Sequence, residues 1–208
     1  MAALLSVTQD DRFLLIRSHY RQEVFGPIGG VFKYYPTARN ALDLYGFSPQ
    51  RRPGDFGEDL RSDLRGFIPG RSMPNFLRWF VSGKQREVEP LTREIREELD
   101  EIGLRHYESR EPYKFDLIRT IYEGPTGVPG EAYLQFRFLQ IYRLDYSCET
   151  GRSLTEHLFS QASQNPNLIA VTSAEIRRRR ANSGEFIGEH SAYLIGDRRT
   201  GIEPAPFT

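Results

Sequence analysis

The chain has 208 residues, which predicts one domain with room for an elaboration and enough buried surface to fold without disulfides. Its 28 basic and 28 acidic residues give a net charge of zero, which argues against a nucleic-acid coat or a membrane-surface protein, because both need a positive excess. The mean hydropathy of −0.54, with no apolar run near the ~20 residues of a membrane span, predicts a soluble globular protein.

The first part of the chain predicts strands followed by an irregular stretch. Residues 1–11 lack the basic start of a signal peptide. Residues 13–16 and about 24–35 are rich in apolar and aromatic residues, which predicts strands. The residues after these are rich in Pro and Gly, with one short helix expected over 37–45. Because so long a structureless loop is unusual in a compact domain, we interpret about 31–82 as an insertion with order of its own.

The second part alternates helices with strands. Helices are expected over about 75–82, 90–102 and 155–164, strands over 115–122, 133–145 and 168–171, and a turn-rich loop over 124–131. The sequence Thr172–Glu175 is a capping box, so a further helix should carry the four arginines Arg177–Arg180. This interleaving, without regular βαβ spacing, predicts a mixed α/β domain that spans residues 1–208.

The helix expected over 90–102 concentrates carboxylates on one side. At about 100° per residue, its four glutamates fall within roughly 100° of the helix circumference, beside an apolar stripe. The glutamates are Glu94, Glu97, Glu98 and Glu101, and the stripe is Leu91, Ile95, Leu99 and Ile102. Like charges four residues apart destabilise a helix by a few tenths of a kcal/mol each. The arrangement suits a hard divalent cation, which takes one or two carboxylates together with water and substrate phosphates. A solvated acidic helix face is the alternative.

These residues resemble the motif of the Nudix hydrolases. The run Arg93–Glu98 fits the Arg-Glu-apolar-x-Glu-Glu core of that motif at every position. The end of the motif is three residues longer here, and the Gly29-Gly30 pair lies about fifty residues before the helix. We therefore interpret the motif as split by an insertion. A second alignment, with Gly83 and Glu89 in the motif, would put Glu97 in place of its arginine.

A narrower resemblance is carried by Phe76–Phe80 and Ser82–Glu87, read together with the acidic helix. These segments are similar to the SMODS-associated NUDIX domains, which occur with cyclic-oligonucleotide synthases in bacterial antiphage systems. The resemblance implies an α/β/α sandwich with a mixed sheet. It also implies a role in antiphage defence.

The resemblance further implies a Mg²⁺- or Mn²⁺-dependent hydrolase that cleaves a phosphoanhydride of a nucleoside diphosphate derivative. Glu97 and Glu98 match the metal ligands of the family, Glu94 matches a glutamate near the metal and the reacting water, Arg93 matches the arginine that orients a glutamate, and Gly30 matches a carbonyl ligand. The general base stays open among Glu101, Glu123 and Glu175, and no substrate-binding residue is assigned.

Two other functions stay open. The longer motif and the displaced glycines favour a module that senses a nucleotide, such as a cyclic oligonucleotide, without turning it over. A structural partner subunit is the third reading. The arginine run and Arg51, Arg52, Arg61, Arg65 and Arg71 could contact phosphates, or could be ordinary surface residues. The lone Cys148 fits a reducing cytoplasm, and no membrane partner is expected.

Overall fold

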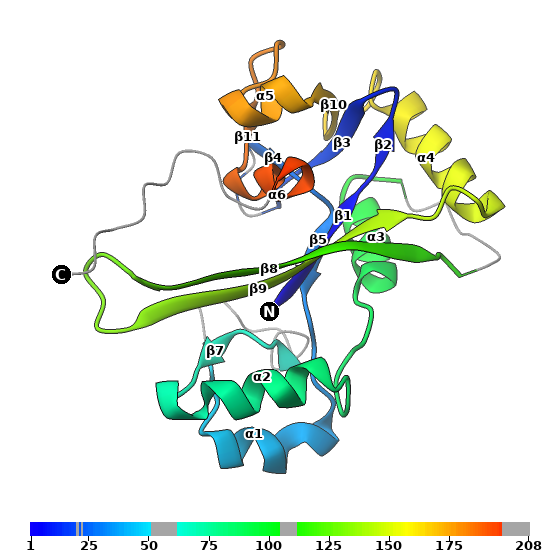
Figure 1. The fold of residues 1–208 in the computed structure, drawn as a ribbon. Coiled ribbons are helices and arrows are strands. Elements are labelled where there is room, and N and C mark those ends of the chain that lie inside the picture. The colour runs from blue at the N-terminus through cyan, green and yellow to red at the C-terminus, as the bar shows by residue number, and fades with distance from the viewer. Residues whose placement is uncertain (20, 22, 51–61, 105–111, 197–208) are drawn as a thin grey trace. The chain divides into compact units, whose positions relative to one another are not determined.

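The structure is a computed structural model that describes residues 1–19, 21, 23–50, 62–104 and 112–196 (Figure 1). It is a mixed α/β protein that separates into two compact units. The smaller unit comprises Met1–Ala3 and Gly30–Pro90, and the larger unit comprises Leu4–Gly29 and Leu91–Thr208. The smaller unit thus covers the range that the sequence interprets as an insertion. That it interrupts the family motif stays a prediction, as does the single domain over 1–208.

The larger unit contains a five-stranded sheet built around β3 (Arg12–Arg17). Its order is β10-β3-β4-β11, and β2 also pairs with β3. The bounds of the other strands are Thr8–Gln9 for β2, Val24–Gly26 for β4, Leu168–Thr172 for β10 and Phe186–Ile187 for β11. β10 runs antiparallel to β3, with Leu168 opposite Ile16. The buried apolar side chains of the two strands are Leu14, Leu15, Ile16, Leu168 and Val171.

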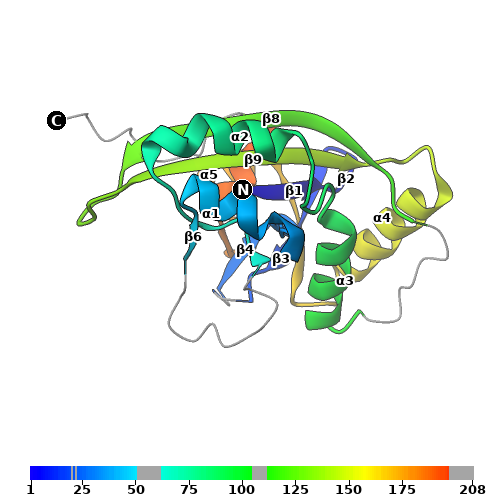
Figure 2. The ribbon, with the colours of Figure 1, turned by 90° about the horizontal axis from the view of Figure 1, so that it is seen from below.

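A second sheet has the order β5-β1-β9-β8. β1 (Ala2–Ser6) and β5 (Gly29–Val31) supply residues to both units. β8 (Phe115–Gly127) and β9 (Leu134–Leu144) form a long antiparallel hairpin, drawn in green in Figures 1 and 2. Its pairing shifts between Leu117 and Arg119 and again between Glu123 and Thr126. Each shift is a β-bulge, in which an extra residue changes the direction of the side chains that follow.

Helices complete the larger unit. They are α3 (Leu91–Glu101), α4 (Glu149–Gln161), α5 (Ser173–Arg178), the 3₁₀ turn η4 (Glu189–Ser191) and α6 (Ala192–Ile195). The predicted apolar stripe of α3 is buried, and Gly103, at φ 81°, follows the end of the helix as expected. α3 lies beside α4 in both views, and the Asn165 side chain donates to the carbonyl of Ile102 at 3.1 Å.

The smaller unit has an aromatic core of its own. Its elements are η1 (Pro36–Ala38), α1 (Arg39–Tyr45), β6 (Ser48–Pro49), β7 (Gly66–Phe67), η3 (Gly70–Ser72) and α2 (Met73–Val81). The rings of Phe47 and Phe76 are stacked 5.9 Å apart, and Trp79 lies 5.6 Å from Phe76. The segment therefore has the internal order that the sequence led us to expect.

Arg86 is the buried cation of this core. Its Nε donates to the carbonyl of Phe80 at 2.6 Å, and its Nη1 donates to the carbonyl of Glu87 at 2.5 Å. The guanidinium also lies 3.8 Å from the ring centre of Phe80 and 5.0 Å from that of Phe32. Hydrogen bonds and aromatic faces together compensate the loss of water around the charge.

The structure corrects several predicted elements. The strand expected over 24–35 is broken into β4 and β5, because Pro27 cannot donate to a strand ladder. The turn-rich loop expected over 124–131 is strand up to Gly127, since the second bulge accommodates Pro125 within β8. α4 begins at Glu149 rather than near residue 155, and β1 is a strand that the sequence did not predict.

Candidate functional site

The acidic face of α3 is organised by Arg93. Its Nη1 donates to Oε1 of Glu94 at 2.5 Å and to Oε2 of Glu97 at 2.9 Å. Only 12 % of the Glu94 side chain is exposed, against 50 % of Glu97. Arg93 therefore offsets part of the repulsion along the helix and fixes two carboxylates relative to each other. The resemblance implies an orienting role for Arg93 in the site, and that role stays a prediction.

Among the glutamates of α3, Glu98 is the one whose negative charge is least compensated by hydrogen bonds or cations. Its Oε1 accepts a hydrogen bond from the backbone N–H of Gly29 at 3.4 Å. Its Oε2 is buried and has no hydrogen-bond partner within the part of the chain that the structure describes. Burial, followed by the negative charge of Glu94, holds the pKa of Glu98 well above its usual 4.5, and the Gly29 bond only partly opposes this.

This oxygen is where the residues fit a divalent cation. An acceptor that is buried, repelled by neighbouring carboxylates and without a donor is the kind of oxygen a hard cation takes as ligand. However, no group of three or more His, Cys, Asp or Glu side chains is arranged to hold a metal among the described residues. A metal here would need water or substrate phosphates to complete its coordination. Gly30 follows Gly29 in β5 and belongs to the smaller unit, so its role as a carbonyl ligand stays a prediction.

A comparison with protein-family models shows which family the chain belongs to. The model of the SMODS-associated NUDIX domain matches residues 1–195. The chain belongs to this family. The match confirms the resemblance carried by Arg93–Glu98 and by the aromatic segment before them. No curated protein and no solved structure matches the chain.

The match accounts for the combination of a mixed α/β fold with a glutamate-rich helix in this NUDIX domain. NUDIX enzymes generally use divalent metals, and the family suggests a ligand derived from a nucleotide. In the described part of this NUDIX domain, no helix is both long enough and apolar enough to cross a membrane.

The three candidates for general base occupy different environments in this NUDIX domain. Glu175 is buried in the capping box of α5 and accepts from the backbone N–H groups of Thr172 at 2.8 Å and Asn182 at 2.7 Å. Glu123 pairs across the hairpin with Arg137 at 2.7 Å. Glu101 is half exposed at the end of α3, and its Oε2 lies 3.8 Å from Nδ1 of His19. Of the three, only Glu101 shares the helix of Glu98.

The arginine run of this NUDIX domain is exposed on and after α5. Arg178 donates to the side chain of Asn182 at 3.0 Å, and Arg180 lies over the ring of Phe186 at 4.9 Å. These two arginines are therefore engaged locally. Arg51, Arg52 and Arg61 lie outside the described residues.

One contact of the acidic helix was not predicted from the sequence. It is the hydrogen bond from the backbone N–H of Gly29 to Glu98, for which the Gly29-Gly30 pair was the available signal.

Proposed function

We propose that this NUDIX domain hydrolyses a phosphoanhydride bond of a nucleoside diphosphate derivative, with Mg²⁺ or Mn²⁺ bound at the acidic face of α3. The observation that supports this most directly is the buried, unsatisfied Oε2 of Glu98. A purely structural carboxylate would be expected to have its oxygens satisfied, because an orphan acceptor costs roughly 1–3 kcal/mol. The cytoplasm of a bacterium defending itself against phage is the setting that we propose for this activity.

Each residue of the proposed metal site would have a separate role. Glu98 and Glu97 would hold the cation, while Arg93 keeps Glu97 and Glu94 in place through its bonds of 2.9 Å and 2.5 Å. The N–H of Gly29 would hold the other oxygen of Glu98, so that Oε2 stays directed away from the strand. A bound divalent cation supplies charge neutralisation of the diphosphate and lowers the pKa of its water.

A second function is favoured by a different observation. Arg93 already occupies Glu94 and Glu97, and no cluster of three metal-binding side chains exists among the residues described. An acidic face restrained in this way is also compatible with a domain that binds a nucleotide, such as a cyclic oligonucleotide, and signals without cleaving it. Under this alternative, Glu98 would orient a bound nucleotide or its counterion.

The test is hydrolysis of a nucleotide panel that includes ADP-ribose, with Mg²⁺ or Mn²⁺, followed by phosphate release and product chromatography. Glu98→Gln should lower any metal-dependent cleavage at least about a hundredfold, because the charge stabilisation of a catalytic metal is worth several kcal/mol. The matched control is Glu156→Gln, an exposed glutamate of α4. Cleavage that survives Glu98→Gln would refute the proposal. A melting shift caused by a cyclic oligonucleotide that is recovered uncleaved would favour the sensing function.

A further inference from the structure

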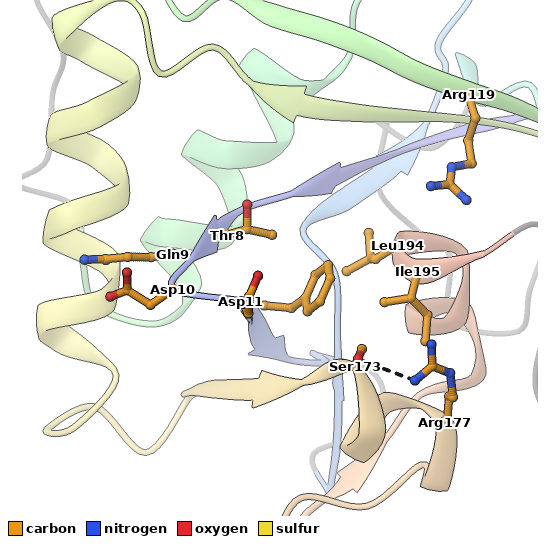
Figure 3. A pocket seen from close by; sticks show the side chains of 10 residues that line it. Thr8, Gln9, Asp10, Asp11, Arg119, Ser173, Arg177, Leu194 and Ile195 are labelled. Carbon is orange, nitrogen blue, oxygen red and sulfur yellow. Dashed lines mark hydrogen bonds between the residues drawn. The ribbon is translucent and has the colours of Figure 1, made fainter.

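The larger unit contains an open hollow of about 780 Å³, and the residues that line it lie outside the acidic face of α3 (Figure 3). The apolar part of its lining is Phe13 from β3 and Leu194 and Ile195 from α6, and the other lining residues are polar. Its sides carry two cations, Arg119 from β8 and Arg177 from α5. A hollow whose lining is mostly polar and charged, with a small apolar part, suits a charged ligand rather than an apolar one.

A β-bulge places Arg119 in this hollow. Leu117 pairs with Tyr142 and Arg119 pairs with Ile141, so Ile118 is the extra residue of β8. After the bulge, Arg119 shares a strand face with Ile121, which is only 5 % exposed. An arginine on the same face as a core isoleucine needs a specific reason, because guanidinium groups rarely face inward without a partner.

No such partner lies within the part of the chain that the structure describes. The Arg119 side chain is half-buried, and its guanidinium makes no hydrogen bond or ion pair with the described residues. The guanidinium of Arg119 loses part of its hydration here without gaining hydrogen-bond acceptors from the protein, which is energetically unfavourable. An anion in the hollow would supply acceptors for several of its five N–H groups.

Arg177 provides a second cation at the same hollow. Its Nη1 donates to Oγ of Ser173 at 3.5 Å, which is a long bond that leaves its other donors available to a ligand. In Figure 3 Arg119 extends from β8 and Arg177 from α5 on either side of Leu194 and Ile195, and the Arg177 guanidinium is turned toward Ser173. Two guanidinium groups that line one hollow favour an anion in it, and their planar donor sets match phosphate oxygens.

Two acidic residues also line the hollow. Asp10 and Asp11 form the exposed turn between β2 and β3, with φ values of 48° and 59°. In Figure 3 Asp10 extends away from the two arginines, toward α4. The turn therefore leaves the arginine side cationic and offers acceptors for hydroxyl groups at the opposite end.

We propose that this hollow binds a phosphorylated small molecule, with Arg119 and Arg177 as the cations that attract its phosphate group. The apolar part of the ligand rests on Phe13 and Leu194, and its hydroxyl groups face the Asp10–Asp11 turn. The site is separate from the acidic face of α3 and does not depend on the function proposed for that helix. A nucleoside monophosphate has all three features, and inorganic phosphate has the anion alone.

The test is calorimetric titration of the whole chain with AMP, inorganic phosphate and adenosine, in EDTA so that no divalent metal contributes. AMP should bind saturably and adenosine should not. Arg177→Gln and Arg119→Gln should each weaken AMP binding at least about tenfold, because each removes charge-assisted hydrogen bonds. Arg177 is exposed, so its replacement leaves the core intact and keeps the test valid even where Arg119→Gln fails to fold.

The matched control is Arg178→Gln, which removes an exposed arginine of the same helix that does not line the hollow. It should leave AMP binding unchanged. Inorganic phosphate that binds and competes with AMP supports the site and identifies the anion as the recognised group. The proposal is overturned by absence of saturable binding of both AMP and phosphate, by equal binding of adenosine, or by an equal loss in Arg178→Gln.

Discussion

Glu98 and Gly29 are joined by a hydrogen bond of 3.4 Å from the backbone N–H of the glycine to Oε1 of the glutamate. The two residues are 69 positions apart, yet both belong to the larger unit. This bond attaches the acidic helix to the glycine pair, and it leaves the second oxygen of Glu98 buried and unsatisfied. The first two predictions follow from this geometry.

Divalent metal should stabilise the protein through the acidic face of α3. A cation at Glu98 would relieve the repulsion from Glu94 and satisfy Oε2, so millimolar Mg²⁺ or Mn²⁺ should raise the Tm. Glu98→Gln should abolish most of that increase, because it removes the ligand charge. The measurement is differential scanning fluorimetry with and without metal. Equal increases in the wild type, in Glu98→Gln and in the Glu156→Gln control would show that the metal acts elsewhere.

The stability gained by Glu98→Gln should depend on pH. The raised pKa means that folding favours the protonated carboxyl, so near pH 4 or below Glu98 costs little in either state. As the pH rises above 4.5 and through the raised pKa, ionisation of Glu98 progressively destabilises the native state. In EDTA, the Tm difference between Glu98→Gln and the wild type should therefore be near zero at or below pH 4 and grow as the pH rises from 4.5 to the raised pKa of Glu98. A difference that stays constant across this range would contradict the prediction.

Glu175 should behave as a structural carboxylate with the opposite pH dependence. Burial favours its neutral form, but hydrogen bonds from Thr172 and Asn182 outweigh this and hold its pKa below 4.5. Its contribution to stability is thus present above pH 4.5 and is lost as the pH falls. Glu175→Ala should cost roughly 2 kcal/mol at pH 7 by urea unfolding, because it removes the capping box and leaves two backbone donors unpaired.

The matched control for this measurement is Glu156→Ala on the exposed face of α4, which should change stability by at most about 0.5 kcal/mol. The metal-induced rise in Tm should survive Glu175→Ala, since Glu175 is engaged in its cap. Loss of that rise in a folded variant would show that Glu175 takes part in metal binding.

Arg86 should be irreplaceable in the core of the smaller unit. Arg86→Lys keeps the charge but cannot reach the carbonyls of Phe80 and Glu87 with two separate nitrogens while stacking on the ring of Phe80. We expect Arg86→Lys and Arg86→Met each to cost about 3 kcal/mol or more by urea unfolding. Arg78→Lys, an exposed change on α2 in the same unit, should stay within about 0.5 kcal/mol. Similar stabilities for Arg86→Lys and the wild type would refute this role.

The sequence was most informative where a pattern is local and periodic. The spacing of Leu91, Ile95 and Leu99 predicted the buried stripe of α3 because helical geometry repeats within one turn. The capping box at Thr172 was equally visible, since both of its hydrogen bonds span three residues. The ion pair between Arg93 and Glu97 follows from the same short spacing.

The sequence was less informative where a distant partner decides the structure. The sequence does not indicate that α4 begins as early as Glu149, because Gly151 is a poor helix former. Glycine stands at this position because a Cβ there would lie 2.1 Å from the carbonyl oxygen of Asp145, which is a contact that only the folded chain makes. The bond between Gly29 and Glu98 depends on chain segments that meet only in the folded protein. The bulge that directs Arg119 has no signature in the apolar residues around it.

The bulge at Ile118 makes the content of the hollow depend on the length of β8 as well as on its composition. Removal of Thr120, the residue after Arg119, would place Arg119 opposite Gln140 and Ile118 opposite Ile141. Because side chains alternate across a strand, this change would turn Arg119 to the opposite face and bring Ile118 toward the hollow. A phosphate-binding wall would become an apolar one without any substitution. A deletion or insertion of one residue in this strand can therefore change which ligand the hollow binds in a single evolutionary step. No other residue of the strand has to be substituted.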